Sequence, residues 1–408
     1  MIALTGATIV LADRAVGPGN LVLDGDRIAE VAPTRRLPTG AREVDLHGCF
    51  IVPGFVDVHV HGVEGCDTLD APAPIAEIAR RLTRYGVTAF CPTTVACSPA
   101  ALRTVLAAVG EARATPIPGG ARVLPAHLES NFINPEYRGA QPLACLRLPP
   151  AAGRPADGPG PRAAASGTVF TAEDILAEIA AARPSVGILT VAPELEGAIA
   201  LIQELVAHGH RVSLGHSAAT YDEGLAGIAA GARGATHLFN RMPPLHHRRP
   251  GLAGAVLESG EVAAEIVCDG YHVHPAMLRA AVASKGPART MAITDGTAGS
   301  GLPVGSRGAL GGRTITVRES AAFLDDGTLA GSVLTMDRAF RLLVETVELS
   351  LVDAATMCAT TPARELGLDG VGRIAAGALA DLAVLDGRLH VTQTWVAGEL
   401  VFDRRRHA

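Results

Sequence analysis

Histidines stand at the end of one short apolar segment of this 408-residue chain. The segment FVDVHVHG contains His59 and His61, which alternate with valines. Because successive side chains of a strand point to opposite faces, the two histidines share one face. An H-x-H pair at the end of a strand suits a metal ion, although the pair alone would also fit two surface histidines.

Four further segments end in a side chain that can bind a metal or accept a proton. They are RVLPAHLES, RVSLGHS, GATHLFN and TMAITDG, and their end residues are Glu129, His216, His237 and Asp295. The same alternation places Val123, Pro125, His127 and Glu129 of the first of these segments on one side. Five strands with such ends are what a site at one edge of a parallel sheet requires.

This set of side chains predicts a metal-dependent hydrolase. Histidine with carboxylate suits Zn²⁺, our first expectation, or Fe²⁺ and similar ions better than Mg²⁺ or Ca²⁺, which prefer oxygen ligands. A bound cation lowers the pKa of its water from about 15.7 towards ~7 and polarises a carbonyl oxygen. Asp295 can accept the proton of that water and return it to a leaving amine. The pattern leaves open whether one or two ions bind.

Strand-like segments and helical stretches alternate through most of the chain. The alternation predicts an α/β fold, a (β/α)8 TIM-like barrel over residues 53–366, whose active site lies at the carboxyl ends of the strands. Thr171 and Asp174 form the capping box of one predicted helix. Gly209 is expected to end another helix, which begins near Pro193.

Both ends of the chain are typical of short strands. Residues 1–52 contain apolar runs around a hairpin signal at Asp24-Gly25, and residues 367–408 return to the same pattern. We therefore expect the two ends to form one small β-sandwich beside the barrel. Residues 149–168 are rich in proline, glycine and alanine, which predicts either a loop over the barrel mouth or an inert insertion.

Charge and cysteine content exclude several other classes of protein. The net charge is −6 and the longest basic run is at 404–406, so the electrostatic footprint of a nucleic-acid-binding protein is missing. Seven cysteines without a C-x-x-C pair indicate reduced thiols. The chain starts without a signal peptide and has no apolar run of ~18 residues. We therefore expect a cytoplasmic protein with no membrane partner.

In order along the chain, these segments resemble the amidohydrolase superfamily and, within it, the N-acetylglucosamine-6-phosphate deacetylase branch. The resemblance is carried by PGFVDVHVHG, HLES-x-FI, LGHS, THLFN-x-M, LHHRRPG, CDGYHVHP, ITDG, DGTLAGS and LTMD, and by TTPARELGL and GRIAAGALADLAVLD near the C-terminus. It implies hydrolysis of the N-acetyl amide of a small amino-sugar substrate, with N-acetylglucosamine-6-phosphate giving glucosamine-6-phosphate and acetate.

The resemblance also implies roles at the metal. Glu129, His216 and His237 would be the primary ligands, with Asp295 as the catalytic base and then the acid. His59 and His61 match family members that can carry a second metal.

Further roles implied by the resemblance concern the substrate. His272, in the D-G-x-H segment, would polarise the acyl carbonyl. Asn240 and Arg248 match positions that hold the sugar phosphate, and a homodimer is implied in which Arg248 serves the neighbouring subunit's site. The loop on the acyl side of the substrate corresponds to Leu329, Ala330, Gly331 and Ser332.

Several residues depart from the family pattern. Ser130-Asn131 replaces Gly-Pro after the glutamate, and Gln141 stands where a substrate-binding histidine is expected. Arg241 replaces a small residue and Arg249 replaces a glutamate, which predicts a more cationic pocket. A deacylase of another N-acylated amine or amino sugar is therefore the main alternative.

Other members of the superfamily fit the sequence less well. Enzymes that bridge two metals with a carboxylated lysine on a barrel strand are disfavoured, because the only lysine, Lys285, follows a helix. Adenosine-type deaminases are disfavoured because their His-Ala-Gly-Glu segment is not found. A non-catalytic scaffold is a distant alternative, since every ligand position is filled.

Overall fold

Parallel strands form the centre of the protein, whose computed structural model describes residues 1–32, 38–150 and 169–406. The strands pair side by side in chain order, and Asp295 N donates to His59 O at 2.9 Å to join the last strand end to the first. The strands are β6 (Phe55–Val60), β9 (Val87–Thr94), β11 (Ala126–Leu128), β12 (Val186–Val191), β13 (Arg211–Leu214), β14 (Gly234–Ala235), β15 (Ala263–Val267) and β16 (Thr290–Ile293). The predicted α/β barrel is confirmed.

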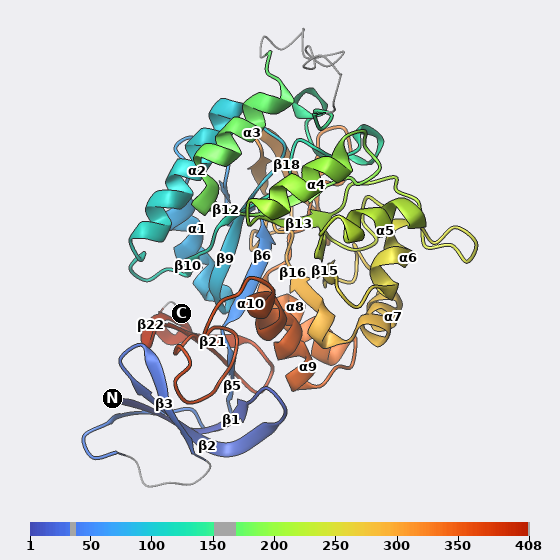
Figure 1. Ribbon diagram of the computed structural model, residues 1–408. Helices are drawn as coiled ribbons and strands as arrows, with labels where there is room; N and C mark the ends of the chain where they lie inside the picture. The colour runs from blue at the N-terminus through green and yellow to red at the C-terminus, as the bar shows by residue number, and fades with distance from the viewer. Residues whose placement is uncertain (33–37, 151–168, 407–408) are drawn as a thin grey trace.

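Helices surround this barrel (Figure 1), as right-handed crossovers between parallel strands require. They are α1 (Ile75–Leu82), α2 (Pro99–Ala114), α3 (Ala172–Ala181), α4 (Ala198–Ala207), α5 (Tyr221–Ala229), α6 (Gly251–Glu258), α7 (Pro275–Lys285) and α8 (Met336–Glu345). The capping box at Thr171 and Asp174 is confirmed. The helix expected near Pro193 begins instead at Ala198, because Gly197 before it has φ of 83°, which does not fit a helix.

Two short segments interrupt the expected barrel pattern. RVLPAHLES is divided at Pro125 into β10 (Arg122–Val123) and β11, since proline has no N–H to donate to a ladder. The segment therefore forms two short strands and not one, while His127 and Glu129 both lie close to His59 inside the barrel. After β16 the chain adds a small antiparallel sheet, which the sequence analysis did not predict: β17 (Arg307–Leu310), β18 (Arg313–Val317) and β19 (Ala322–Leu324).

The two chain ends share one eight-stranded sheet beside the barrel (Figure 1). Its strands are β1 (Ile2–Val10), β2 (Ala15–Asp24), β3 (Arg27–Ala32), β4 (Arg42–Asp45), β5 (Phe50–Pro53), β20 (Leu382–Leu385), β21 (Val391–Val396) and β22 (Glu399–Asp403). Antiparallel pairing of β5 with β20 joins the N-terminal strands to the C-terminal ones. The buried Trp395 lies in the core of this sheet. The predicted domain of both chain ends is confirmed, while its boundaries at 52/53 and 366/367 stay predictions.

The remaining elements complete the outside of the barrel. The hairpin of β7 (Gly62–Val63) and β8 (Cys66–Asp67) follows β6, and α9 (Leu351–Ala355), a π-helical turn at Thr356–Thr360 and α10 (Thr361–Glu365) follow α8. Residues 151–168, most of the predicted Pro/Gly-rich loop, lie outside the described residues. Among the helices of the described ranges, none is long and apolar enough to cross a membrane.

Candidate active site

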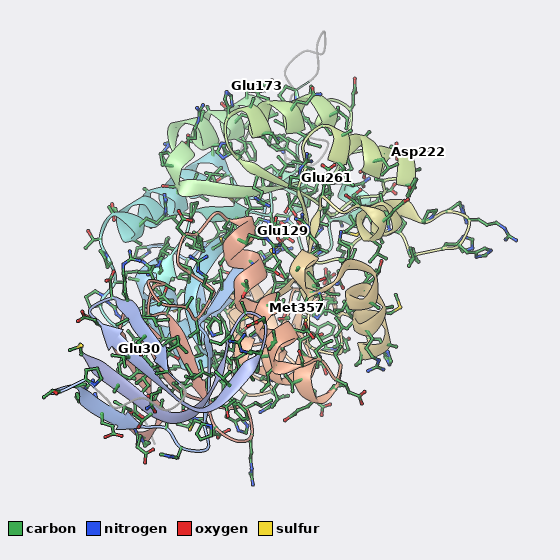
Figure 2. All side chains as sticks on the ribbon, turned by 60° about the horizontal axis from the view of Figure 1, so that its bottom comes forward. Glu30, Glu129, Glu173, Asp222, Glu261 and Met357 are labelled. Carbon is green, nitrogen blue, oxygen red and sulfur yellow. The ribbon has the colours of Figure 1, made fainter. Side chains whose placement is uncertain are left out.

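The metal-ligand residues predicted from the sequence come together where the barrel strands end. His216, His237 and Asp295 each stand two residues beyond a strand, with φ of 47°, 30° and 47°. Non-glycine residues with positive φ are uncommon and cluster at functional sites, where the surroundings hold them. These turns direct the three side chains into the barrel mouth. Figure 2 shows Glu129 within the barrel, far from Glu30 in the end sheet.

A first group of ligand atoms consists of Glu129, His216 and His237. Glu129 Oε1 lies 2.8 Å from Nε2 of each histidine, and the two Nε2 atoms are 3.0 Å apart. Ligand atoms about 2.0–2.1 Å from a tetrahedral zinc lie about 3.3 Å from one another. Two buried imidazole nitrogens that face each other beside a carboxylate can share a cation, either a proton or a metal ion. These three residues therefore fit a divalent metal ion.

A second group lies beside the first and shares Glu129. His59 Nε2 and His61 Nε2 are 3.3 Å apart, and Asp295 Oδ1 lies 3.5 Å and 3.3 Å from them. Glu129 Oε2 is 3.4 Å from His61 Nε2. These separations match the edges of a tetrahedron around one ion. Glu129 thus belongs to both groups: its Oε1 contacts His216 and His237, and its Oε2 lies near His61.

The buried carboxylates make this site strongly attractive to positive charge. Burial acts to lower the pKa of His61, but hydrogen bonds to Asp295 and Glu129 raise it to about 10. Burial lowers the pKa of His59 to about 4, which keeps this imidazole neutral and ready to bind a metal. For Glu129 burial acts to raise the pKa, yet His216 and the other histidines hold it well below its ordinary value. A divalent cation can take the place of the proton on His61.

Deeper in the barrel, a carboxylate orients His59. Glu265 Oε2 lies 2.9 Å from His59 Nδ1, so an N–H at Nδ1 leaves the Nε2 lone pair free for a metal. His127 fills the space beside it, with Nδ1 3.0 Å from Val58 O and Nε2 2.9 Å from Thr190 Oγ1. Glu265 was not predicted from the sequence, although it is the one charged residue of the buried strand AAEIV.

We expect Glu265→Gln to lower the affinity of the His59–His61 group for metal by ~10–100-fold, the usual effect of changing a residue that orients a histidine ligand. Glutamine keeps the size of the side chain but removes the charge that favours the Nδ1–H form of His59. Metal content after titration against a chelator measures this loss. The exposed Glu173→Gln variant serves as the control, and equal affinities in both variants would contradict the orienting role.

A pocket of about 460 Å³ opens over both groups. It is lined by His61, Val95, Glu129, Ala140, Gln141, His216, His237, Asn240, Arg241, His272, Asp295, Leu310, Leu329 and Gly331. His272 Nδ1 lies 2.6 Å from Asp269 Oδ2, while its buried Nε2 has no partner among the described residues. Gly331 has φ of 71°, and a Cβ there would come within 3.1 Å of Asp295 O. The loop can therefore approach the end of β16 only with glycine at this position.

Two residues that depart from the family pattern face this pocket. Gln141 Oε1 accepts from Ala96 N at 2.7 Å, and its Nε2 donates to Glu129 Oε2. Arg241 has φ of 51°, and its guanidinium lies over Gly139, where any Cβ would collide with it. Arg241 therefore brings a positive charge to the wall of the pocket beside the metal groups.

Other predicted residues lie away from the pocket wall. Ala330 is buried, and Ser332 donates from N to Asp295 O at 2.9 Å and from Oγ to Thr294 O at 2.5 Å. Arg248 and Arg249 are exposed in the loop before α6, which projects from the barrel in Figures 1 and 2. Within one chain, Arg248 is not among the residues that line the pocket. The predicted substrate contacts of these residues stay predictions.

Ser130 and Asn131, which also depart from the family pattern, tie the segment after β11 to the backbone of neighbouring segments. Ser130 Oγ donates to Thr190 O at 2.5 Å. Asn131 Nδ2 donates to Cys97 O at 2.8 Å and to Cys145 O at 2.7 Å. Neither side chain lines the pocket, so the Ser-Asn pair supports the pocket from behind.

Comparison with known proteins agrees with this geometry. The profile of the amidohydrolase family matches residues 50–401. The chain belongs to the amidohydrolase family. This amidohydrolase is an enzyme that hydrolyses its substrate, and the geometry of its histidine and glutamate groups suits a divalent metal.

Individual relatives cover nearly the whole amidohydrolase chain. The N-acetylglucosamine-6-phosphate deacetylase of Mus musculus is 36% identical over 410 residues, which are 98% of this chain and 93% of the relative. The N-acetylgalactosamine-6-phosphate deacetylase of Escherichia coli O157:H7 is 34% identical over 92% of this chain and 93% of the relative. A structure of a mutant N-acetyl-D-glucosamine-6-phosphate deacetylase from Mycobacterium smegmatis, in complex with N-acetyl-D-glucosamine-6-phosphate, is 33% identical with a TM-score of 0.86. It covers 98% of this chain and 99% of that chain.

Proposed function

We propose that this amidohydrolase hydrolyses N-acetylglucosamine-6-phosphate to glucosamine-6-phosphate and acetate. The observation that carries the proposal is one pocket in which Asp295 and two metal-ligand groups face Asn240 and Arg241. Asp295 and the metal-ligand groups can hydrolyse an amide, and Asn240 and Arg241 can hold an anion. The relatives and the substrate complex described above support the choice of this sugar phosphate.

The proposed mechanism assigns one role to each group. When bound, a divalent ion, with Zn²⁺ our choice for this donor set, supplies Lewis-acid chemistry that activates water and polarises a carbonyl. Glu129, His216 and His237 would hold one ion, and His59 with His61 would hold a second where two ions bind. Asp295 accepts the proton of the attacking water and returns it to the leaving nitrogen. His272 pairs through Nδ1 with the Asp269 carboxylate, which points Nε2 at the pocket. As the imidazolium, which carries an N–H on both ring nitrogens, His272 would donate a hydrogen bond from Nε2 to the acyl oxygen.

The sugar phosphate is proposed to lie against Asn240 and Arg241, with Arg248 added from a second subunit. Guanidinium groups bind phosphate through paired hydrogen bonds. Because this role of Arg248 requires a second subunit, we also propose a homodimer, which light scattering of the purified protein tests. We further propose that the protein acts in the cytoplasm.

Arg248→Ala and Arg241→Ala are each expected to raise KM about tenfold or more for the phosphorylated sugar, because each removes a charge-assisted hydrogen bond. The KM for plain N-acetylglucosamine should stay unchanged. Arg14→Ala, an exposed change in the turn between β1 and β2 of the end sheet, is the control. Equal losses on both sugars would remove the residue concerned from phosphate binding.

A different N-acylated amino sugar or amine is the second candidate substrate. Gln141 and Arg241 change the wall of the pocket, and one relative is named for the galactosamine compound. Release of the carboxylic acid, which is acetate for N-acetyl compounds, should therefore be measured on N-acetylglucosamine-6-phosphate, N-acetylgalactosamine-6-phosphate, N-acetylglucosamine and a panel of N-acyl amines. The highest kcat/KM on the first is the expected result. Silence on the first with turnover of another would reassign the pocket, and silence on all would favour a non-catalytic scaffold.

A further inference from the structure

A second cavity, which is open to solvent, lies next to the metal pocket; the open space in and above it amounts to about 700 Å³. Gln141 lines both cavities. The loop and sheet after β16 also serve both, since Leu310 and Leu329 line the metal pocket while Arg313 and Thr328 line the second cavity. The two cavities are therefore neighbours that share walls.

The second cavity has an excess of positive charge. Arg313 is partly buried, and its Nε and Nη2 have no partner among the described residues. Arg138 is held by its Nη1 bond to Pro135 O at 2.8 Å. Asp326 is the single acidic residue in the described lining, and its Oδ1 already accepts from Thr328 N at 2.9 Å. The cavity thus contains two guanidinium groups and one carboxylate, and N–H donors of Arg313 have no acceptor among the described residues.

Unused guanidinium donors inside a cavity indicate that something else binds them. Burial lowers the pKa of Arg313, Asp326 opposes this effect and Arg138 adds to it. An oxyanion between the two arginines would accept the unused N–H groups in the paired geometry that guanidinium favours. It would also offset the repulsion between the two positive charges.

We propose that this cavity is a second anion subsite, which binds a carboxylate or phosphate of a small molecule through Arg138 and Arg313. Because the cavity shares Gln141 with the metal pocket, the anion is either a second acidic group of the substrate or a free oxyanion that acts on the neighbouring site. The first of these two sources rests on the proposed function. The existence of the subsite does not.

Isothermal titration of the metal-loaded protein with inorganic phosphate tests the subsite. The wild type is expected to bind one more phosphate per chain than Arg313→Gln or Arg138→Gln. Arg307→Gln is the matched control, because Arg307 lies exposed in the same small sheet and pairs with Asp325 at 3.4 Å. Arg313→Lys, which keeps the charge, should retain the extra phosphate and thereby separate binding from folding. Equal stoichiometry in the wild type and in both glutamine variants would overturn the proposal.

The active site is tested separately in the same titration. Arg241→Ala is expected to remove a different phosphate and to leave the one that depends on Arg313. If Arg241→Ala removes no phosphate, the proposed phosphate site of the active site fails. If Arg313→Gln removes none, this inference fails, and the two results are independent.

Kinetics with two substrates identify the source of the anion. If the anion belongs to the substrate, Arg313→Gln lowers kcat/KM at least tenfold for an N-acyl sugar phosphate whose acyl group carries a carboxylate, and spares the N-acetyl compound. If the anion is free, added phosphate changes kcat for the N-acetyl compound in the wild type and not in Arg313→Gln. Identical kinetics of wild type and Arg313→Gln in both assays would overturn any link between the cavity and the reaction.

Discussion

Asp295→Asn is expected to lower kcat by ~10²–10⁴-fold, the usual contribution of a positioned proton acceptor. Asparagine has nearly the same shape as aspartate and keeps an oxygen towards His59 and His61, but it cannot take a proton from water. Although burial acts to raise it, the pKa of Asp295 is lowered by its hydrogen bond to His61. The carboxylate is therefore ionised and ready to accept a proton. Acetate release at saturating substrate measures the loss.

Metal content decides how the Asp295→Asn result is read. The group of Glu129, His216 and His237 does not include Asp295, so the variant should still bind its metal there. Asp222→Asn, an exposed change at the start of α5, is the control for handling and folding. Near-normal turnover of Asp295→Asn with full metal content would show that another group accepts the proton.

The positions of the metal-ligand residues could be predicted because one rule fixes them. Parallel strands of a barrel end at the same rim, so residues just beyond the strands meet whatever the loops do. His216, His237 and Asp295 follow this rule, and the sequence places each at the end of an apolar run. Their positive φ was not predictable, because tertiary contacts hold each turn in that conformation.

Residues within strands and long loops were harder to predict. Glu265 lies in the middle of β15, a buried strand whose other residues are all apolar, so no alternation of polar and apolar residues marks its face. Ser130 and Asn131 looked like determinants of the substrate, but the side chain of Ser130 bonds to the backbone of β12, and that of Asn131 bonds to backbone at Cys97 and Cys145. Arg248 lies in a loop whose direction depends on contacts that a sequence does not specify.

Breaks in the regular elements depend on single residues with unusual backbones. Pro125 divides a predicted strand, and Gly197 delays a predicted helix. Both residues are visible in the sequence as punctuation. What the sequence does not decide is whether a given proline or glycine ends an element or only bends it, because neighbouring strands and helices can compensate.

Glu129→Gln is expected to have the widest effect on the metal centre, because Glu129 is the one residue shared by both groups of ligands. Its oxygens lie 2.8 Å from His216 and His237 and 3.4 Å from His61. Glutamine is the same size, but its neutral amide leaves four histidine side chains around a site with one negative charge fewer. We expect metal affinity to fall by more than the ~10–100-fold cost of changing a residue that only touches a ligand.

Turnover of Glu129→Gln should disappear together with its metal. Elemental analysis of the purified variant and acetate release at increasing metal concentration measure both quantities in one experiment. Glu173→Gln, exposed in the first turn of α3, is the control and should match the wild type. If excess metal restores full activity, the carboxylate contributes only affinity. If the variant keeps its metal and still loses turnover, Glu129 acts in the reaction itself and the metal is held by the histidines alone.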